Sequence, residues 1–303
     1  MFSLNMTDKA KKPAPKIAIL LASYNGTHYI KEQIESILEQ RGVEVHLFIS
    51  VDLSTDDTHE VCCKYEQKHQ NITVLSYGES FGRAGKNFYR LIRDVNFSDY
   101  EFVALSDQDD FWEPTKLSHA VNIINNYASD AYSSLVTAVW SDGREKVDKK
   151  SNAQKEFDYY FESAGSGCSY VFKCQALQEF KDILLNKWHN VNEVETHDWL
   201  IYAFFRSRNM SWHIDNKVLI RYLQHESNQF GANFGLKAYI KRINMIYSGW
   251  YRSEVEKIYN IVGVQSSKVF NLEKRFLLRN FYQLRRRNRD VFFLFLMVLI
   301  GLF

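Results

Sequence analysis

The stretch LSDQDDFWEPTKL, residues 105–117, is the most informative part of the sequence. The apolar run Phe102–Leu105 that leads into it predicts a buried strand, and Pro114 opens a helical pattern. Three carboxylates therefore follow the carboxyl end of one strand: Asp107, Asp109 and Asp110. Such carboxylates repel one another unless a cation neutralises them, and Mg²⁺ or Mn²⁺ choose oxygen ligands of this kind and share them with the phosphates of a substrate. The alternative is a solvated acidic turn in which Asp110 caps the helix.

Strand and helix patterns alternate around this stretch through the first 126 residues. Apolar runs predict strands at Ile17–Leu21, Val43–Val51, Ile72–Leu75 and Phe102–Leu105. Helical patterns follow these runs at residues 30–38, from Asp56 onward, across 88–95 and at 114–126. Such alternation predicts a mostly parallel sheet with helices on both faces, and ligands of such sheets bind at the carboxyl ends of strands. We therefore expect one crevice to gather Tyr24, Asp52 and Asp107.

The second half of the chain is less regular. Further strands are predicted at Leu135–Trp140, Ser169–Phe172 and Val218–Tyr222, with helices at 175–186 and 198–206. The charged stretch Ser141–Lys155 has almost no apolar residue, and its composition predicts a mobile loop. From about residue 234 the chain is helical in pattern, aromatic and basic.

Composition narrows the classes of function. A chain of 303 residues, 46% of them hydrophobic, can form one large domain or a domain with an appendage. A net charge of +2 argues against general affinity for nucleic acid. The four cysteines lack a C-x-x-C spacing, so zinc is not favoured. Residues 1–15 are polar and show no secretory signal, which predicts a flexible N-terminus and a reducing, cytoplasmic environment.

Several motifs, spread over residues 16–235, resemble those of glycosyltransferase family 2, whose members are inverting enzymes with the GT-A fold. The residues 22–26 (ASYNG) resemble the family's opening strand-end motif, and 49–56 (ISVDLSTD) its I-x-D-D-G-S-x-D segment. In that second segment Val51 replaces the first Asp and Leu53 the Gly. Residues 107–109 resemble the family's D-x-D motif. The variants SDQDDxW and HDW are most similar to the rhamnosyltransferase branch, which uses dTDP-L-rhamnose to build bacterial surface polysaccharides.

The resemblance implies roles for individual residues. The implied metal ligands for Mg²⁺ or Mn²⁺ are Asp109, Asp107 and His225. The implied donor-binding residues are Ala22, Tyr24, Asp52, Arg83, Lys86, Asp107 and Arg221. The implied acceptor-binding residues are Gly167, Cys168 and Trp199. Asp198 matches the catalytic base, because an acceptor hydroxyl needs a carboxylate to take its proton during attack. The alternative for Asp198 is a helix N-cap, and for residues 165–168 a simple tight turn.

The C-terminus combines charge with an apolar end. Val291–Phe303 is an uninterrupted apolar segment, about 20 Å long as a helix against about 30 Å for a bilayer core, so spanning is not expected. The arginines at 285–289 precede it and predict an interfacial anchor on anionic headgroups. The alternative is packing of this tail on its own domain or on a second subunit in a homo-oligomer.

The combined expectation is an α/β protein with a GT-A domain at 16–233 and a helical membrane-association region at 234–303. Within the domain, residues 16–110 form the nucleotide-sugar half and 111–233 the acceptor half. The expected activity is metal-dependent, inverting transfer of a sugar, with L-rhamnose the best guess, to a glycan or lipid-linked acceptor at the cytoplasmic membrane face. The alternatives are a nucleotide-sugar hydrolase, a nucleotidyltransferase, or a non-catalytic nucleotide-binding assembly subunit.

Overall fold

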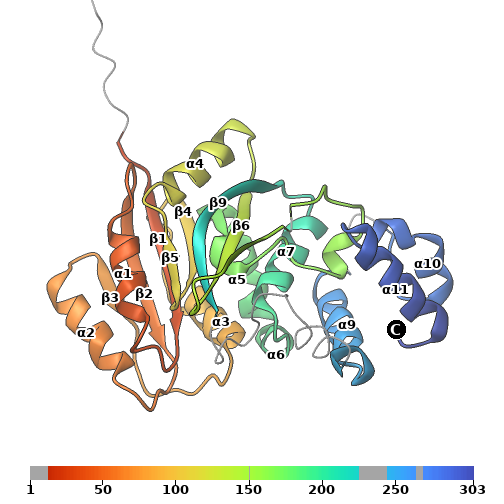
Figure 1. Cartoon of the computed structure of the whole chain (residues 1–303), viewed down its shortest axis with the longest axis horizontal. Helices are drawn as coiled ribbons and strands as arrows, with labels where there is room; N and C mark the ends of the chain where they lie inside the picture. The colour runs from red at the N-terminus through yellow and green to blue at the C-terminus, as the bar shows by residue number, and fades with distance from the viewer. Residues whose placement is uncertain (1–12, 150, 225–243, 264–268) are drawn as a thin grey trace, which may run out of the picture.

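The computed structural model describes residues 13–149, 151–224, 244–263 and 269–303. Its described strands form one curled sheet in the order β3-β2-β1-β4-β8-β6-β9-β5, and β7 pairs with β6 (Figure 1). The strands are β1 Lys16–Ser23, β2 Glu44–Val51, β3 Ile72–Val74, β4 Phe102–Asp107, β5 Asp110–Trp112, β6 Ala131–Trp140, β7 Glu145–Asp148, β8 Val171–Lys173 and β9 Trp212–Gln224. Strands β1–β4, β6 and β9 run in one direction, while β5, β7 and β8 run in the other. The prediction of a mostly parallel sheet is confirmed.

Helices lie between the strands in the predicted alternation. They are α1 Ile30–Leu38, α2 Thr58–Lys68, α3 Ala84–Asp94, α4 Lys116–Asn126, α5 Cys174–Asn186, α6 Trp188–Asn192 and α7 His197–Ser207. The C-terminal part adds α9 Trp250–Val262, α10 Lys274–Arg279 and α11 Asn288–Ile300. No helix of the described residues is both long and apolar enough to cross a membrane.

The two faces of the sheet are buried in separate cores, because successive side chains of a strand point to opposite faces. Ile17, Ile19 and Leu21 of β1 pack in the core under α1 and α4. Ala18 and Leu20 of the same strand pack in the opposite core, to which α3, α5, α7, α9 and α11 contribute. Burial on both faces explains why these strands read as continuous apolar runs rather than alternating ones.

The charged stretch 141–155 is not a loop throughout. Glu145–Asp148 forms β7, an edge strand that pairs antiparallel with β6 between Val136 and Val139. Gly143, at φ 83°, supplies the tight turn, where its N–H donates to the carbonyl of Trp140. The mobile-loop prediction was wrong here, because an exposed edge strand can be charged when backbone pairing holds it in place.

The described C-terminal helices pack into the same core as α5 and α7 (Figure 1). Leu294, Met297 and Val298 of α11 are buried in this core. Buried charges tie the region down further: Arg286, 5% exposed, donates to Asp158 Oδ2 at 3.0 Å. Arg285 donates to the carbonyl of Phe161 at 2.9 Å. The expectation that this arginine cluster faces lipid headgroups is therefore corrected for these two residues, which hold the protein together instead.

Candidate active site

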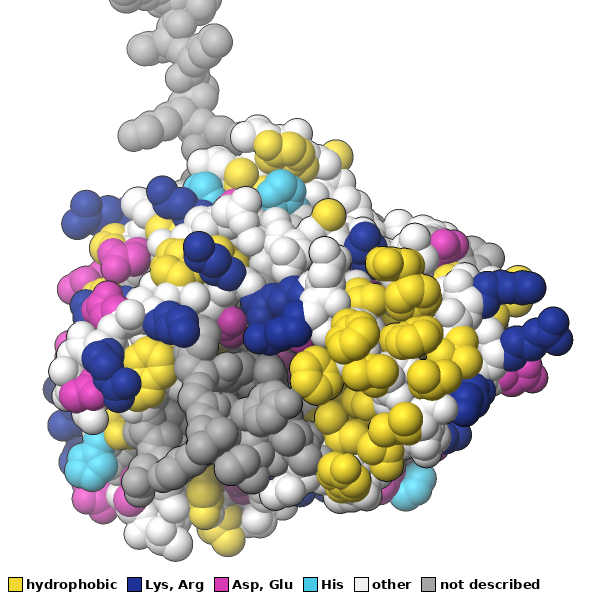
Figure 2. Space-filling view, turned by 45° about the vertical axis from the view of Figure 1, so that its right-hand side comes forward, with side chains coloured by type: hydrophobic (Ala, Val, Ile, Leu, Met, Phe, Trp, Pro, Cys, Tyr) yellow, Lys and Arg dark blue, Asp and Glu magenta, His cyan; other side chains and the backbone are white. Residues whose placement is uncertain are grey.

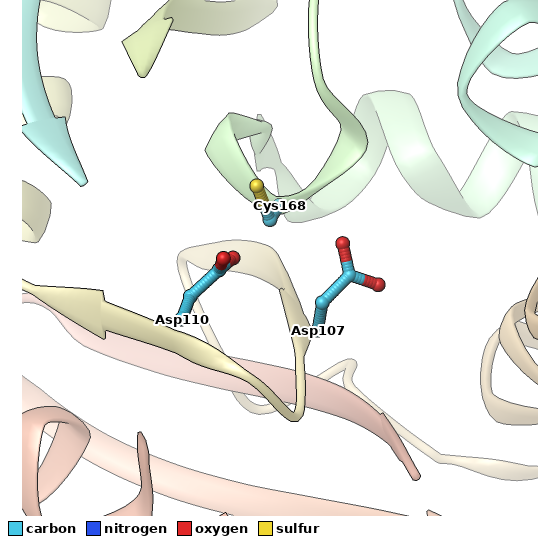
Figure 3. A group of neighbouring side chains, drawn as sticks. All are labelled: Asp107, Asp110 and Cys168. Atoms are coloured by element: carbon cyan, nitrogen blue, oxygen red, sulfur yellow. The ribbon is translucent and has the colours of Figure 1, made fainter. Parts of the chain in front are cut away.

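The carboxyl ends of β1, β2 and β4 meet at one edge of the sheet, where the acidic stretch begins. Ala22 of β1 pairs with Asp107, the last residue of β4. The Asp107 side chain and the Asp110 side chain of β5 point toward the 3-10 turn Gly167–Ser169, which carries Cys168 (Figure 3). One ligand atom from each lies within 4.8 Å of the other two. The strand ends thus place two carboxylates and a thiol around one small volume.

These carboxylates are held in an unfavourable electrostatic environment. Burial, followed by the negative charges of Asp109 and Asp198, raises the pKa of Asp107 to about 8. Burial and the charges of Asp107 and Asp109 raise the pKa of Asp110 well above its usual range. Neither oxygen of Asp110 accepts a hydrogen bond of ordinary geometry from the described residues, although the Cys168 thiol lies beside it. A cation with oxygen ligands would satisfy this carboxylate, so the residues fit a divalent metal.

Asp110 does not cap a helix in a solvated turn. It is 2% exposed and pairs with Tyr222 across β5 and β9, while α4 begins only at Lys116. Lys116 is itself buried, with Nζ 3.2 Å from the centroid of the Trp112 ring. Burial lowers the pKa of Lys116 to about 7, against the opposing charges of Cys168 and Asp110. One lysine does not balance three ionised carboxylates, so Asp107 and Asp110 hold protons that a bound cation would displace.

Gln108, the central residue of the D-x-D motif, joins the acidic stretch to the loop after β1. Its Oε1 accepts the Ser23 hydroxyl at 2.6 Å and the Tyr24 N–H at 2.8 Å, and its Nε2 donates to the Tyr24 carbonyl at 2.9 Å. A Cβ on Gly26 would lie 2.1 Å from Gln108 Oε1, so only glycine leaves room for this bridge. Sequence reasoning did not single out Gln108, although an amide between two aspartates was a visible signal. Tyr24 itself is half exposed.

Asp52 organises a loop rather than standing free. Its Oδ1 accepts the backbone N–H groups of Leu53 and Phe81, both at 2.8 Å, and its Oδ2 accepts that of Gly82 at 2.9 Å. With a side chain only 4% exposed, Asp52 holds together the two loops that carry Leu53 and Arg83. Asp52 follows the last residue of β2, as predicted, but its carboxylate is already engaged with the protein backbone. Lys86 lies further on, in the first turn of α3, and is partly exposed.

Asp198 lies at the start of α7, across from the acidic cluster. The helix begins at His197 and its N-cap position is Thr196, so Asp198 is not the N-cap. Its charge is one of the causes that raise the pKa of Asp107, which places the two carboxylates in electrostatic reach. A Cβ on Gly167 would lie 3.2 Å from Asp198 Cβ and 2.8 Å from His197 Nε2. Gly167 is therefore a close-approach glycine beside Asp198, not merely a turn residue.

Two predicted acceptor-binding residues, Trp199 and Cys168, are buried. Trp199 is 5% exposed, and its Nε1 donates to the Tyr159 carbonyl at 3.0 Å, so it is a core residue. Cys168 is fully buried beneath the surface, beside Asp110. Neither side chain is placed to touch an acceptor, because both are covered by protein.

Two predicted donor-binding arginines are engaged in ion pairs. In β9, Arg221 is followed by Tyr222, which lies near Asp107 and Asp110. Because successive side chains of a strand point to opposite faces, Arg221 points away from these aspartates. There it pairs with Glu145 of β7 at 2.9 Å. Arg83, half exposed, pairs with Glu195 just before α7. His225 lies outside the described residues.

Comparisons with known proteins agree with this geometry. Residues 18–183 match the family model described as glycosyl transferase family 2. The "dTDP-rhamnosyl transferase RfbG" of Shigella flexneri is 41% identical over 289 residues, which cover 93% of this chain and 100% of that protein. Staphylococcus aureus TarS 1–349, solved with UDP-GlcNAc, superposes with a TM-score of 0.56 at 17% identity, covering 89% of this chain and 73% of that one.

A second solved structure gives the same fold. The mannosyltransferase PcManGT of Pyrobaculum calidifontis, in complex with GDP-Man and Mn²⁺, superposes with a TM-score of 0.53 at 14% identity, covering 96% of this chain and 86% of that one. The predicted GT-A fold is confirmed by these likenesses. Because the family model spans more than half of the residues and one relative matches almost end to end, the chain belongs to glycosyl transferase family 2.

Proposed function

We propose that this glycosyltransferase moves L-rhamnose from dTDP-L-rhamnose to a hydroxyl of a glycan or lipid-linked acceptor in the synthesis of a bacterial surface polysaccharide. The observation that carries the proposal is the 41% identity, over the full length of the relative, to a protein named a dTDP-rhamnosyl transferase. A likeness of that extent covers both the donor half and the acceptor half of the chain, so it bears on both substrates.

The transfer is a single displacement with inversion. The acceptor oxygen attacks the anomeric carbon of the sugar, its proton passes to the Asp198 carboxylate, and the bond from that carbon to the diphosphate oxygen breaks to release dTDP. Asp198 is partly exposed at the start of α7, and its Oδ1 accepts the Trp199 N–H at 2.9 Å, which fixes the orientation of the carboxylate. The second oxygen remains for the acceptor hydroxyl.

Mg²⁺ or Mn²⁺ would be held by Asp109 and Asp107, with the unsatisfied Asp110 carboxylate close behind. The Mn²⁺ in the PcManGT complex supports a divalent ion in this fold. When bound, such an ion stabilises the negative charge of the departing diphosphate. The protein holds the carboxylates of Asp107, Asp109 and Asp110 close together at the end of β4, with Lys116 as the nearby basic residue.

The C-terminal helices provide a face for the cytoplasmic side of a membrane. Figure 2 shows a broad apolar patch with Lys and Arg side chains at its rim. On α11 the exposed apolar residues are Phe292, Phe293, Leu296, Leu299 and Ile300. The exposed basic residues nearby in sequence are Lys274, Arg275, Arg279 and Arg289. An apolar stripe with a basic rim suits insertion at the boundary of an anionic bilayer, where a lipid-linked acceptor would also lie.

Donor choice is tested by thermal stabilisation, because a bound donor raises the apparent stability of the protein. The purified chain is melted with Mn²⁺ and a panel of nucleotide sugars that includes dTDP-L-rhamnose, dTDP-glucose, UDP-GlcNAc and GDP-mannose. We expect dTDP-L-rhamnose to give the largest rise in melting temperature, and Asp109→Asn to remove most of it. A larger rise with a UDP- or GDP-sugar would refute the proposed donor.

Membrane contact is tested by point substitutions, since truncation at Val291 would also remove buried core residues. The double variant Phe292→Ser/Phe293→Ser changes only exposed positions and should stop the protein from floating with anionic liposomes. Leu185→Ser, at a half-exposed leucine of α5, is the matched control and should float like the unmodified protein. Unchanged flotation of the double variant would show that this face does not meet the membrane.

A further inference from the structure

A fully buried carboxylate from the C-terminal region lies under the segment that carries Asp198. Glu254 of α9 is 0% exposed. Its Oε2 accepts the backbone N–H of Glu195 at 3.1 Å and the hydroxyl of Thr196 at 3.2 Å. Its Oε1 accepts the ammonium of Lys257 at 3.0 Å. Every polar atom of this side chain is thus committed to residues 195–196 or to its own counter-ion.

This contact replaces the usual start of a helix. Thr196 holds the N-cap position of α7, where a threonine hydroxyl ordinarily accepts an N–H from the first turn of its own helix. Here no such side-chain cap forms, and the hydroxyl donates to Glu254 instead. The beginning of α7, two residues before Asp198, is therefore fixed by a residue from α9 rather than by its local sequence.

The same segment is held from other sides. Glu195 accepts hydrogen bonds on its side chain from Arg83 and from Trp250 Nε1, the latter at 3.0 Å. A Cβ on Gly85 would lie 2.3 Å from the Glu195 carbonyl oxygen. The backbone of α3 therefore packs directly against the backbone of Glu195. A Cβ on Gly167 would lie 2.8 Å from the side-chain Nε2 of His197, so the 167 turn also lies close to this segment. Movement of residues 195–197 is restricted by α3, α9 and the 167 turn together.

Burial raises the pKa of Glu254, because it is costly to keep a charged carboxylate away from water. The nearby Lys257 ammonium lowers the same pKa, but by less. A buried ion pair adds little net stability on average, because desolvation offsets most of the attraction. Stability alone is therefore a weak reason for this arrangement, whereas precise placement of a reacting carboxylate is a strong one, since a misplacement of about 1 Å can cost about a hundredfold in rate.

We propose that Glu254 is a positioning residue for Asp198: it sets the start of α7 so that the Asp198 carboxylate faces the acceptor hydroxyl. The inference rests on the proposed role of Asp198 as the base. It also gives the C-terminal region a part in the chemistry, because Glu254 of α9 contacts the residues that precede Asp198.

The test is a double-mutant cycle measured as kcat and as KM for dTDP-L-rhamnose. Glu254→Ala should lower kcat about ten- to a hundredfold with donor KM within about twofold. Glu254→Gln should recover part of kcat, because its amide oxygen still accepts the Glu195 N–H. Glu256→Ala, on an exposed face of the same helix, should leave both constants unchanged. In an Asp198→Asn background, Glu254→Ala should cause no further loss.

Each outcome separates positioning from the alternatives. An unchanged kcat for Glu254→Ala, or an equal loss with and without the Asp198 carboxylate, would overturn the positioning role. If Glu254→Ala does not fold, Glu254→Gln carries the same cycle. Wild-type turnover of Asp198→Asn alone would instead overturn the base assignment, so the two failures are distinguishable.

Discussion

Raising the pH from 6 to 8 should strengthen Mn²⁺ binding about fiftyfold through Asp107 alone. With a pKa of about 8, the Asp107 carboxyl is ionised in about 1% of molecules at pH 6 and in about half at pH 8. A metal ion that takes this carboxylate must displace the proton, so its apparent affinity follows the ionised fraction. Burial contributes most to raising the pKa of Asp107, and the negative charges of Asp109 and Asp198 contribute next.

The same shift has a consequence for the metal-free protein. The unfolded Asp107 carboxyl ionises near its ordinary value of about 3.9, whereas the folded one holds its proton up to about pH 8. Between these values the folded state binds more protons, so the contribution of this group to the free energy of unfolding falls as pH rises. Mn²⁺ should reverse that trend, since it stabilises the ionised folded form.

The assay is a titration of free Mn²⁺ by electron paramagnetic resonance at pH 6, 7 and 8 with the purified protein. Asp107→Asn should bind more weakly at pH 8 and lose most of the pH dependence. Asp142→Asn, at an exposed acid in the turn before β7, is the control and should keep the full dependence. Equal affinity of the unmodified protein at pH 6 and pH 8 would refute the reasoning.

Three further substitutions test the site. Asp198→Asn should lower turnover about a hundred- to ten-thousandfold with donor affinity nearly unchanged, and poor donor binding at normal turnover would move this residue to the donor site. Asp109→Asn should abolish metal-dependent turnover while melting like the unmodified protein, and normal activity at low Mn²⁺ would contradict the assignment. Gly167→Ala places a Cβ 2.8 Å from His197 Nε2, so it should cost about 1–3 kcal/mol of stability and also lower kcat. An unchanged melting temperature would show that the His197 side chain moves aside without a loss of stability.

The first half of the fold was predictable because its signals are local. Continuous apolar runs and helical spacing fix β1 to β4 and α1 to α4, and parallel strands necessarily bring Ala22 and Asp107 to the same edge. The three-residue strand β5 was not predictable. Its residues, Asp110 to Trp112, form a strand only because β9 lies alongside, and β9 is about a hundred residues away in sequence.

The side of a strand or helix that a residue faces was harder to predict. Arg221 has the charge expected of a phosphate ligand, but its place in the register of β9 turns it toward Glu145. The segment 291–303 is apolar on all sides as a helix, so its sequence does not say which stripe packs and which stays exposed. The structure divides it, with Leu294 and Val298 buried and Phe292 and Ile300 exposed.

Some contacts that position the site involve residues that lie outside any recognisable sequence motif. Glu254 reads in sequence as one of several charges on a helix, and its partners are about sixty residues earlier. Asp52 was placed correctly at a strand end, but its engagement with the N–H groups of Phe81 and Gly82 depends on a loop thirty residues away. Local patterns predict elements, whereas the partners of a buried carboxylate depend on the assembled fold.

Product analysis with dTDP-L-rhamnose, Mn²⁺ and a panel of soluble sugar glycosides as acceptors tests the central claim most directly. We expect equal amounts of dTDP and a new rhamnoside, with the anomeric configuration inverted relative to the donor, and at least a hundredfold less of both from Asp198→Asn. Free rhamnose with dTDP and no glycoside would identify a hydrolase. Release of dTMP and rhamnose 1-phosphate would place the reaction at the diphosphate, and either result would contradict sugar transfer to a hydroxyl.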